Sequence, residues 1–188
     1  VNSLLIWFST TAVAIYGICT KIQSLVTVGV HGLDNGLIPI VAYNYGAGKR
    51  NRIYQAIRWT LIYGAAIYLV FFLVLEGVPS LVLRIFDASP EMLTIGVPAL
   101  RILALGYFIS TVGMVLAAVF QALGLGFFSL GLTLARQVIL PLILVLMVLP
   151  CGRLELVWWA FVLAEGIAIP IGLVFWRRVK LCVVETVF

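Results

Sequence analysis

The chain of 188 residues carries only 12 basic and 7 acidic side chains, with a formal net charge of +5. Apolar residues make up 64% of it, and the mean hydropathy is +1.21. A soluble domain of this size needs about a quarter of its residues charged to cover its surface. The composition therefore excludes an ordinary water-soluble globular protein and predicts an integral membrane protein.

The apolar segments predict an all-α, polytopic transmembrane helix bundle. A helix needs about 20 largely apolar residues to cross a bilayer, and the runs here are too long for barrel strands and lack their alternation. We expect a partial helix within 1–8, a loop FDASPEML at 86–93, and five spans near 11–45, 54–76, 97–122, 128–149 and 155–177. Because the chain begins without Met inside an uncharged run, we interpret it as a fragment that starts within a membrane helix.

Basic residues follow the first and the last of these spans. The first cluster is Lys49, Arg50, Arg52 and Arg58, and the second is Arg177, Arg178 and Lys180. Such clusters are typical of the cytoplasmic side of a membrane. We therefore expect the 46–53 turn, the 123–127 turn and the C-terminus to face the cytoplasm, in a bacterial plasma membrane. Cys151 and Cys182 then lie on opposite sides and cannot pair.

The segment IPIVAYNYGAGKRNRI (38–53) has two possible interpretations, a phosphate-binding loop and a helix leaving the membrane. A phosphate-binding loop requires G-x-x-x-x-G-K-[ST], but Tyr43 replaces its first glycine and Arg50 its hydroxyl residue. Pro39 can kink a helix, and Gly46 and Gly48 allow a tight exit from it. The pattern thus favours the end of a membrane helix.

Four segments together resemble the multidrug and toxic compound extrusion (MATE) family of transporters. GLDNGLIPIVAYNYGAGKRNRI is similar to the segment after the eighth helix of these transporters. LRILALGYFISTVGMVLAAVFQALG, ARQVILPLILVLMVLP and VWWAFVLAEGIAIPIG resemble the tenth, eleventh and twelfth helices in order and spacing. The resemblance covers nearly the whole chain. The residues that match its motifs are Pro39, Asn44, Gly46, Ala47, Gln121, Gly124, Arg136, Pro141 and Glu165.

The resemblance implies that the chain is the C-terminal lobe of a transporter whose two six-helix lobes enclose a central cavity. Its partners would be the N-terminal lobe of the same parent chain, the lipid bilayer and small cationic, lipophilic substrates, exported in exchange for H⁺ or Na⁺. We expect no enzymatic activity, no cofactor besides that ion, no metal site and no nucleic-acid partner.

Two other functions are weighed against drug export. A flippase for lipid-linked saccharides should line its cavity with several Arg or Lys side chains for a pyrophosphate, and only Lys21 looks central. A membrane scaffold that transports nothing predicts no ionisable residues inside the spans, yet Lys21, Asp34 and Glu165 are there.

Ionisable groups inside a membrane are costly, so each is a functional candidate with a structural alternative. Lys21, followed by Gln23, either responds to a coupled proton or is a structural lysine. Asp34 and Asn35 either bind H⁺ or Na⁺ or cap a broken helix, and Gly32 and Gly36 around them could let another helix approach closely. Glu165 either titrates near neutral pH or, as we favour, pairs with Arg136 as part of the scaffold.

The deep aromatic residues and the remaining polar residues complete the set of candidates. Tyr16 and Tyr107 could face a cavity, where an aromatic ring attracts organic cations. Arg101 and Arg136 are expected to anchor span ends at the interface. His31 is either a hydrogen-bonded packing residue, as we favour, or a pH-sensitive switch. Some drug exporters of the family bind the coupling ion through an acidic residue of the tenth helix, but GYFISTVGMV (106–115) has none. This absence argues against Na⁺ coupling through this lobe and favours a proton site in the N-terminal lobe.

Overall fold

The computed structural model describes the whole chain except residues 1–4, 7–8 and 180–188. Within this part, the chain forms helices and no strands. In chain order they are α2 (Thr10–Gly46), α3 (Arg50–Gly77), α4 (Pro79–Ile85), α5 (Pro90–Ala122), α6 (Gly126–Leu134), the π-helical η1 (Ala135–Ile139), α7 (Leu140–Val148), the 3₁₀-helical η2 (Leu149–Cys151) and α8 (Leu154–Val179).

Five of these segments are long and apolar enough to cross a membrane. They are α2, α3, α5, the continuous stretch Gly126–Cys151 formed by α6, η1, α7 and η2, and α8. The prediction of an all-α transmembrane bundle is therefore confirmed. The partial helix expected within 1–8 falls mostly outside the described residues, as do Lys180 and Cys182.

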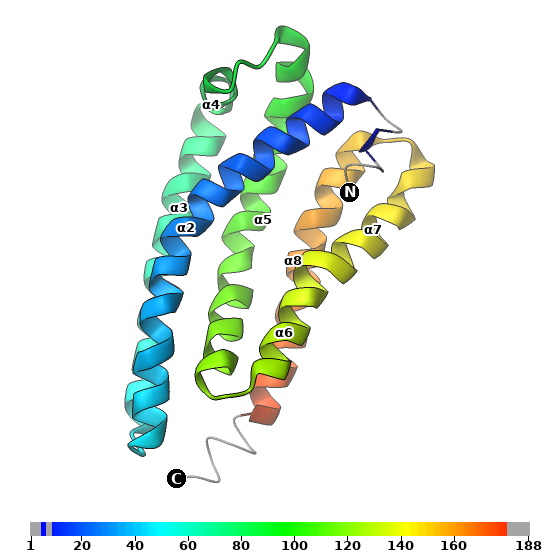
Figure 1. Cartoon of the computed structure of the whole chain (residues 1–188). Helices are drawn as coiled ribbons and strands as arrows, with labels where there is room; N and C mark the ends of the chain where they lie inside the picture. Colours follow the sequence, from blue (N-terminus) through cyan, green and yellow to red (C-terminus); the bar gives the residue numbers. More distant parts are fainter. Residues whose placement is uncertain (1–4, 7–8, 180–188) are drawn as a thin grey trace.

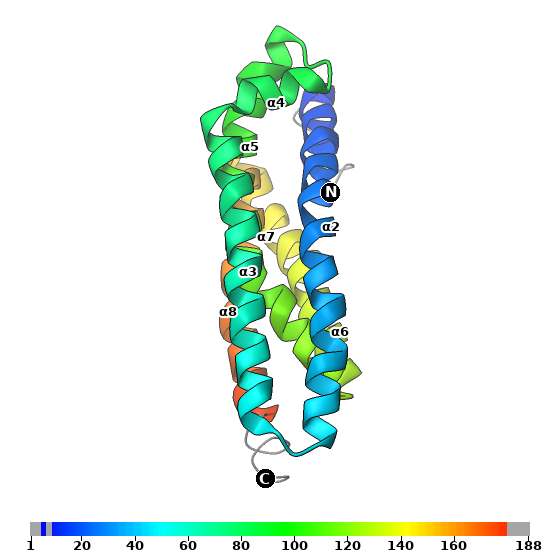
Figure 2. The ribbon, with the colours of Figure 1, turned by 90° about the vertical axis from the view of Figure 1, so that its left-hand side faces the viewer.

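Helix α5 is the axis of the bundle (Figures 1 and 2) and packs against α2, α3 and α8. In its most apolar stretch 67% of the residues are buried, against 39% or less in the other four spans. Large apolar side chains on the outer helices are exposed instead, as at Phe127 and Val70. This distribution is expected where hydrocarbon, rather than water, surrounds the protein.

The turns of the bundle divide between its two ends as the basic residues predicted. The α2–α3 turn, the α5–α6 turn and the end of α8 lie at one end (Figure 1), and α4 lies at the other with the α7–α8 turn. The three segments that we assigned to one side of the membrane thus share one end. That this side is the cytoplasm stays a prediction.

The structure corrects the prediction for the segment after α3, where we expected a loop over residues 86–93. Helix α5 begins inside that loop, at Pro90, rather than near residue 97. Ser89 Oγ accepts a hydrogen bond from the Met92 N–H at 3.3 Å, and Glu91 lies in the first turn, so standard start signals outweigh the polar composition. The short helix α4 was not predicted, and it also begins with a proline.

Helix α2 continues without a break through Gly32, Gly36 and Pro39, so the broken helix that Asp34 and Asn35 could have capped does not form. Figure 1 shows that it changes from an oblique to an upright direction about halfway along. Side-chain hydroxyls lie in its first half, where Thr20, Ser24 and Thr27 donate hydrogen bonds of 2.7–2.9 Å to carbonyls of the preceding turn. Hydrogen bonds of this kind often bend helices.

Candidate functional site

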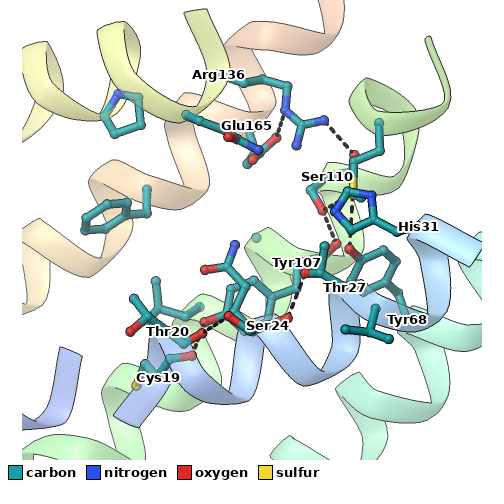
Figure 3. Close-up of a pocket in the computed structure, with 18 of the residues that line it drawn as sticks. Cys19, Thr20, Ser24, Thr27, His31, Tyr68, Tyr107, Ser110, Arg136 and Glu165 are labelled. Carbon is teal, nitrogen blue, oxygen red and sulfur yellow. Dashed lines mark hydrogen bonds and ion pairs between the residues drawn. The ribbon is translucent and has the colours of Figure 1, made fainter. Parts of the chain in front are cut away.

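A cavity of about 520 Å³ opens between α2, α3, α5, α8 and the helix formed by η1 and α7. Figure 3 shows its side chains converging from these elements. Its polar lining consists of Thr20, Gln23, Ser24, Thr27, His31, Ser110, Arg136, Gln137 and Glu165, with Tyr16, Tyr68 and Tyr107. Polar groups are rare inside membrane spans and usually face a water-filled or ligand-binding space, which makes this cavity the candidate site.

Helix α2 supplies one continuous polar face to the cavity. Tyr16, Thr20, Gln23, Thr27 and His31 follow one another at intervals of three or four residues, which places them on the same side of a helix. Our sequence analysis selected Tyr16 and Gln23 but missed the hydroxyl residues, although this spacing was the signal that could have found them. His31, which we expected to be a packing residue, is part of the same face.

Arg136 and Glu165 form an ion pair at the edge of the cavity (Figure 3). Arg136 Nε lies 3.2 Å from Glu165 Oε2, and the two side chains are 5% and 16% exposed. Arg136 Nη1 also donates a hydrogen bond of 3.2 Å to the Ser110 carbonyl of α5. The predicted pairing is confirmed. The interfacial anchoring that we expected for Arg136 is wrong, because this side chain is buried inside the bundle.

A π-helical turn places Arg136 within its span. Pro141 has no backbone N–H and therefore cannot complete an α-helical bond to the carbonyl four residues earlier. Just before it, the Leu140 N–H bonds to the Ala135 carbonyl, five residues back, and the turn Ala135–Ile139 widens. Such turns occur frequently at functional sites.

Gly113 of α5 leaves the space that the Arg136 side chain occupies. A Cβ atom added at this glycine would lie 2.5 Å from Arg136 Nη1 and 2.7 Å from its Cδ. The guanidinium therefore crosses α5 where α5 has no side chain. We did not select Gly113 from the sequence, since a glycine within a membrane helix has many possible packing roles.

Aromatic residues form another wall of the cavity. The Tyr16 ring stacks on Phe161 at 5.5 Å between centroids and on Trp158 at 6.3 Å. The Tyr107 hydroxyl donates to the Cys19 carbonyl at 3.2 Å, and the Tyr68 hydroxyl donates to Met114 Sδ at 3.2 Å. Both deep tyrosines that we selected thus line the cavity.

The other ionisable candidates of α2 do not line it. Lys21 and Asn35 are exposed on other faces of the helix. Asp34 is only 8% exposed, and its Oδ1 atom has no hydrogen-bond partner among the described residues. It lies within the electrostatic influence of His31 and Arg136. Asp34 is therefore a buried carboxylate beside the cavity rather than in its wall.

The remaining motif residues mainly shape helix ends. Asn44 Nδ2 donates to the Ile40 carbonyl at 2.8 Å, α2 ends at Gly46, and the Ala47 N–H bonds back to the Tyr43 carbonyl. Gln121 is exposed in the last turn of α5. Gly124 has φ +76° and forms the turn that follows. At the opposite end of the bundle, Arg101 Nε lies 3.2 Å from Glu76 Oε2.

Breaking the Arg136–Glu165 pair on one side should destabilise the protein more than removing both charges. Glu165→Leu or Arg136→Met alone leaves an unpaired buried charge, and each should lower the free energy of unfolding by about 3 kcal/mol. The double variant should be more stable than either single variant. Thermal unfolding of the intact protein in detergent measures this, and losses that simply add would contradict the coupling.

Gly113→Ala should destabilise the protein by about 1–3 kcal/mol, because the new methyl group displaces the Arg136 side chain, which Glu165 and the Ser110 carbonyl hold in place. Gly131 is the matched control, since a Cβ atom there meets nothing within 4 Å. Gly131→Ala should be neutral or stabilising by up to about 1 kcal/mol, through helix propensity alone. The same sign for both variants in thermal unfolding would show that Arg136 does not depend on Gly113.

Comparison with known proteins relates the chain to membrane transporters. The sequence model of the MatE family matches residues 1–147. The multidrug export protein MepA of Staphylococcus haemolyticus (strain JCSC1435) is 25% identical over 168 residues, which is 89% of this chain and 36% of MepA. The chain thus spans little more than a third of the length of this relative.

Solved structures share the fold over almost the whole chain. A MATE transporter crystallised in its bent conformation superposes with a TM-score of 0.90 at 22% identity, over 99% of this chain and 42% of its own. A MOP superfamily transporter from Pyrococcus furiosus, described as having a binding pocket of reverse polarity, gives 0.89 at 22% identity, with 98% and 42% covered. Because the family model matches most of the chain and the fold agrees, the chain belongs to the MatE family, the multidrug and toxic compound extrusion transporters that its motifs indicated.

Proposed function

We propose that the chain is the C-terminal lobe of a secondary transporter that exports cationic, lipophilic compounds by antiport with H⁺ or Na⁺. The observation that carries the proposal is the polar cavity inside an apolar bundle, lined by tyrosines and by one balanced ion pair. MepA is a multidrug export protein, which supports the export of drugs. Because the chain covers 36% of MepA, the rest of the transport pathway would come from the N-terminal lobe of the parent protein.

The lining of the cavity suits a cation better than an anion. The positive charge of Arg136 is offset by Glu165 at 3.2 Å, and the Tyr16 ring offers the negative face of its π system. A flippase for a lipid-linked saccharide would need several unpaired cations for the pyrophosphate. Lys21, the one candidate for that role within the spans, is exposed outside the cavity. These contacts favour the exporter over the flippase.

For the membrane orientation we propose that the end of the bundle with the α2–α3 turn faces the cytoplasm of a bacterial cell. Its described residues include the basic group Lys49, Arg50 and Arg52 and the pair Arg177 and Arg178. The opposite end carries charges of both signs. Its basic residues are Arg84 and Arg153, and its acidic residues are Asp87, Glu91 and Glu155. Lys and Arg are enriched in cytoplasmic loops, which supports this orientation.

Asp34 is the proposed coupling residue of this lobe. Its buried Oδ1 atom has no hydrogen-bond donor among the described residues, so a proton or Na⁺ would satisfy it. The tenth-helix segment 106–115 lacks a carboxylate, and α5 places Ser110 and Thr111 in this region instead. Asp34 thus offers this lobe a coupling carboxylate, one of the two roles that our sequence analysis allowed for it, although that analysis favoured a proton site in the N-terminal lobe.

Reconstituted into proteoliposomes, the intact protein should export an ethidium-like cation when a proton or Na⁺ gradient is imposed. The gradient supplies the free energy, so efflux should stop when an ionophore dissipates it. Fluorescence of the dye follows the transport, and an anionic dye of similar size serves as control. Equal efflux with and without any gradient would reject antiport, and transfer of a lipid-linked saccharide would favour the flippase.

Asp34→Asn should reduce gradient-driven efflux to the rate seen without a gradient, while equilibrium binding of the dye persists. The amide keeps the size of the carboxylate but can neither release a proton nor balance a Na⁺ ion. Glu91→Gln is the matched control, because this exposed carboxylate lies at the far end of α5. Full gradient-driven efflux by the Asp34 variant would assign coupling to another group.

A further inference from the structure

A second hollow, separate from the cavity, runs along the surface of the described chain between α2 and α3. It measures about 480 Å³ and is lined by Gly36, Ile40 and Asn44 of α2 and by Arg52, Gln55 and Trp59 of α3, among others. The two helices are antiparallel neighbours joined by the turn at 47–49 (Figure 2). We call this hollow the α2–α3 groove.

The groove changes from polar to apolar along its length. Asn44, Arg52 and Gln55 lie near the turn, at the end of the bundle, whereas Gly32 and Tyr63 lie at the opposite limit of the groove. Between residues 32 and 44, helix α2 rises by about 18 Å. This length is close to the ~15 Å of hydrocarbon in one bilayer leaflet. The dimensions therefore match one lipid molecule, with its headgroup at the turn.

No described side chain or helix fills the floor of the groove. A Cβ atom added at Gly32 or Gly36 would meet nothing within 4 Å, so the close helix approach that we expected at these glycines does not occur within the described chain. Trp59 and Ile40, on its two sides, are 53% and 50% exposed, and the Trp59 ring stacks on Tyr63 at 5.7 Å. Exposed apolar walls above a smooth backbone floor provide room for an acyl chain.

Within α2, α3 and the turn between them, the charge near the polar end is entirely positive. The sequence has no Asp or Glu between Asp34 and Glu76, but it has Lys49, Arg50, Arg52 and Arg58 in that interval. The first turn of α3 contains no acidic residue, so the positive end of the helix dipole adds to these cations. A second copy of this chain placed symmetrically on the groove would bring two such positive ends together, which disfavours a homodimer here.

We propose that the α2–α3 groove binds one anionic phospholipid, with its phosphate at Arg52 and an acyl chain over Gly32 and Gly36. Arg52 is the basic residue that lines the groove, and a guanidinium binds phosphate with two parallel hydrogen bonds. Basic pockets between membrane helices are known to hold anionic headgroups. The site is independent of the proposed antiport, since it lies outside the cavity.

The headgroup contact can be tested on the intact protein by native mass spectrometry in micelles doped with phosphatidylglycerol or phosphatidylcholine. Arg52→Gln should lower phosphatidylglycerol retention about fivefold, the loss expected for one basic residue near an anionic lipid. Arg58→Gln removes the same charge from the same helix at an exposed position outside the groove, and it should leave retention unchanged. Equal losses of phosphatidylglycerol retention in both variants would show that only general surface charge matters, and would overturn the proposal.

The acyl-chain contact needs a variant that fills the groove. Gly36→Leu should also reduce phosphatidylglycerol retention, because the new side chain occupies the floor, whereas Gly131→Leu on α6 should not. Thermal unfolding of each variant verifies that it is folded. Unchanged retention in a folded Gly36→Leu protein would overturn the proposal, as would equal retention of phosphatidylcholine and phosphatidylglycerol by the unmodified protein.

Discussion

The buried guanidinium of Arg136 imposes the strictest local requirement on this bundle. An isolated charge within a membrane span is unstable, so it must find a counter-ion and hydrogen-bond acceptors inside the protein. Two other helices meet this requirement: α8 supplies Glu165, and α5 supplies the Ser110 carbonyl and leaves space for the side chain at Gly113. The guanidinium thus links the η1 turn to α5 and α8, and the apolar side chains of these helices pack around it.

The same arrangement explains why a cavity exists at this level of the bundle. The polar face of α2 turns toward the ion pair rather than toward hydrocarbon, and the hydroxyls of Thr20, Ser24 and Thr27 are satisfied by carbonyls of their own helix. These side chains can therefore line a space without binding one another across it. A wall whose hydrogen bonds are satisfied locally can accept different ligands, as the multidrug export that we propose would require.

The sequence predicted the features that depend on composition along the chain. Long apolar runs gave the five spans, and their basic ends grouped three segments at one end of the bundle. The start of α5 at Pro90 was missed because Asp87, Pro90 and Glu91 together are as typical of a loop as of a helix start. Whether Arg136 anchors at the interface or is buried depends on the π-helical turn, on Gly113 of α5 and on Glu165 of α8. Such relations exist only in three dimensions.

Asp34 and Lys21 show the same distinction on a single helix. Both are ionisable residues of α2, and nothing in the residues around them indicates that one is buried and the other exposed. The direction of each follows from helix geometry: 13 positions separate them, and at about 100° per residue they point some 140° apart. Once the polar face is directed at α5, Asp34 is carried inward beside it and Lys21 away from it. The orientation of α2, and not the chemistry of either side chain, therefore decides which of the two can respond to the cavity.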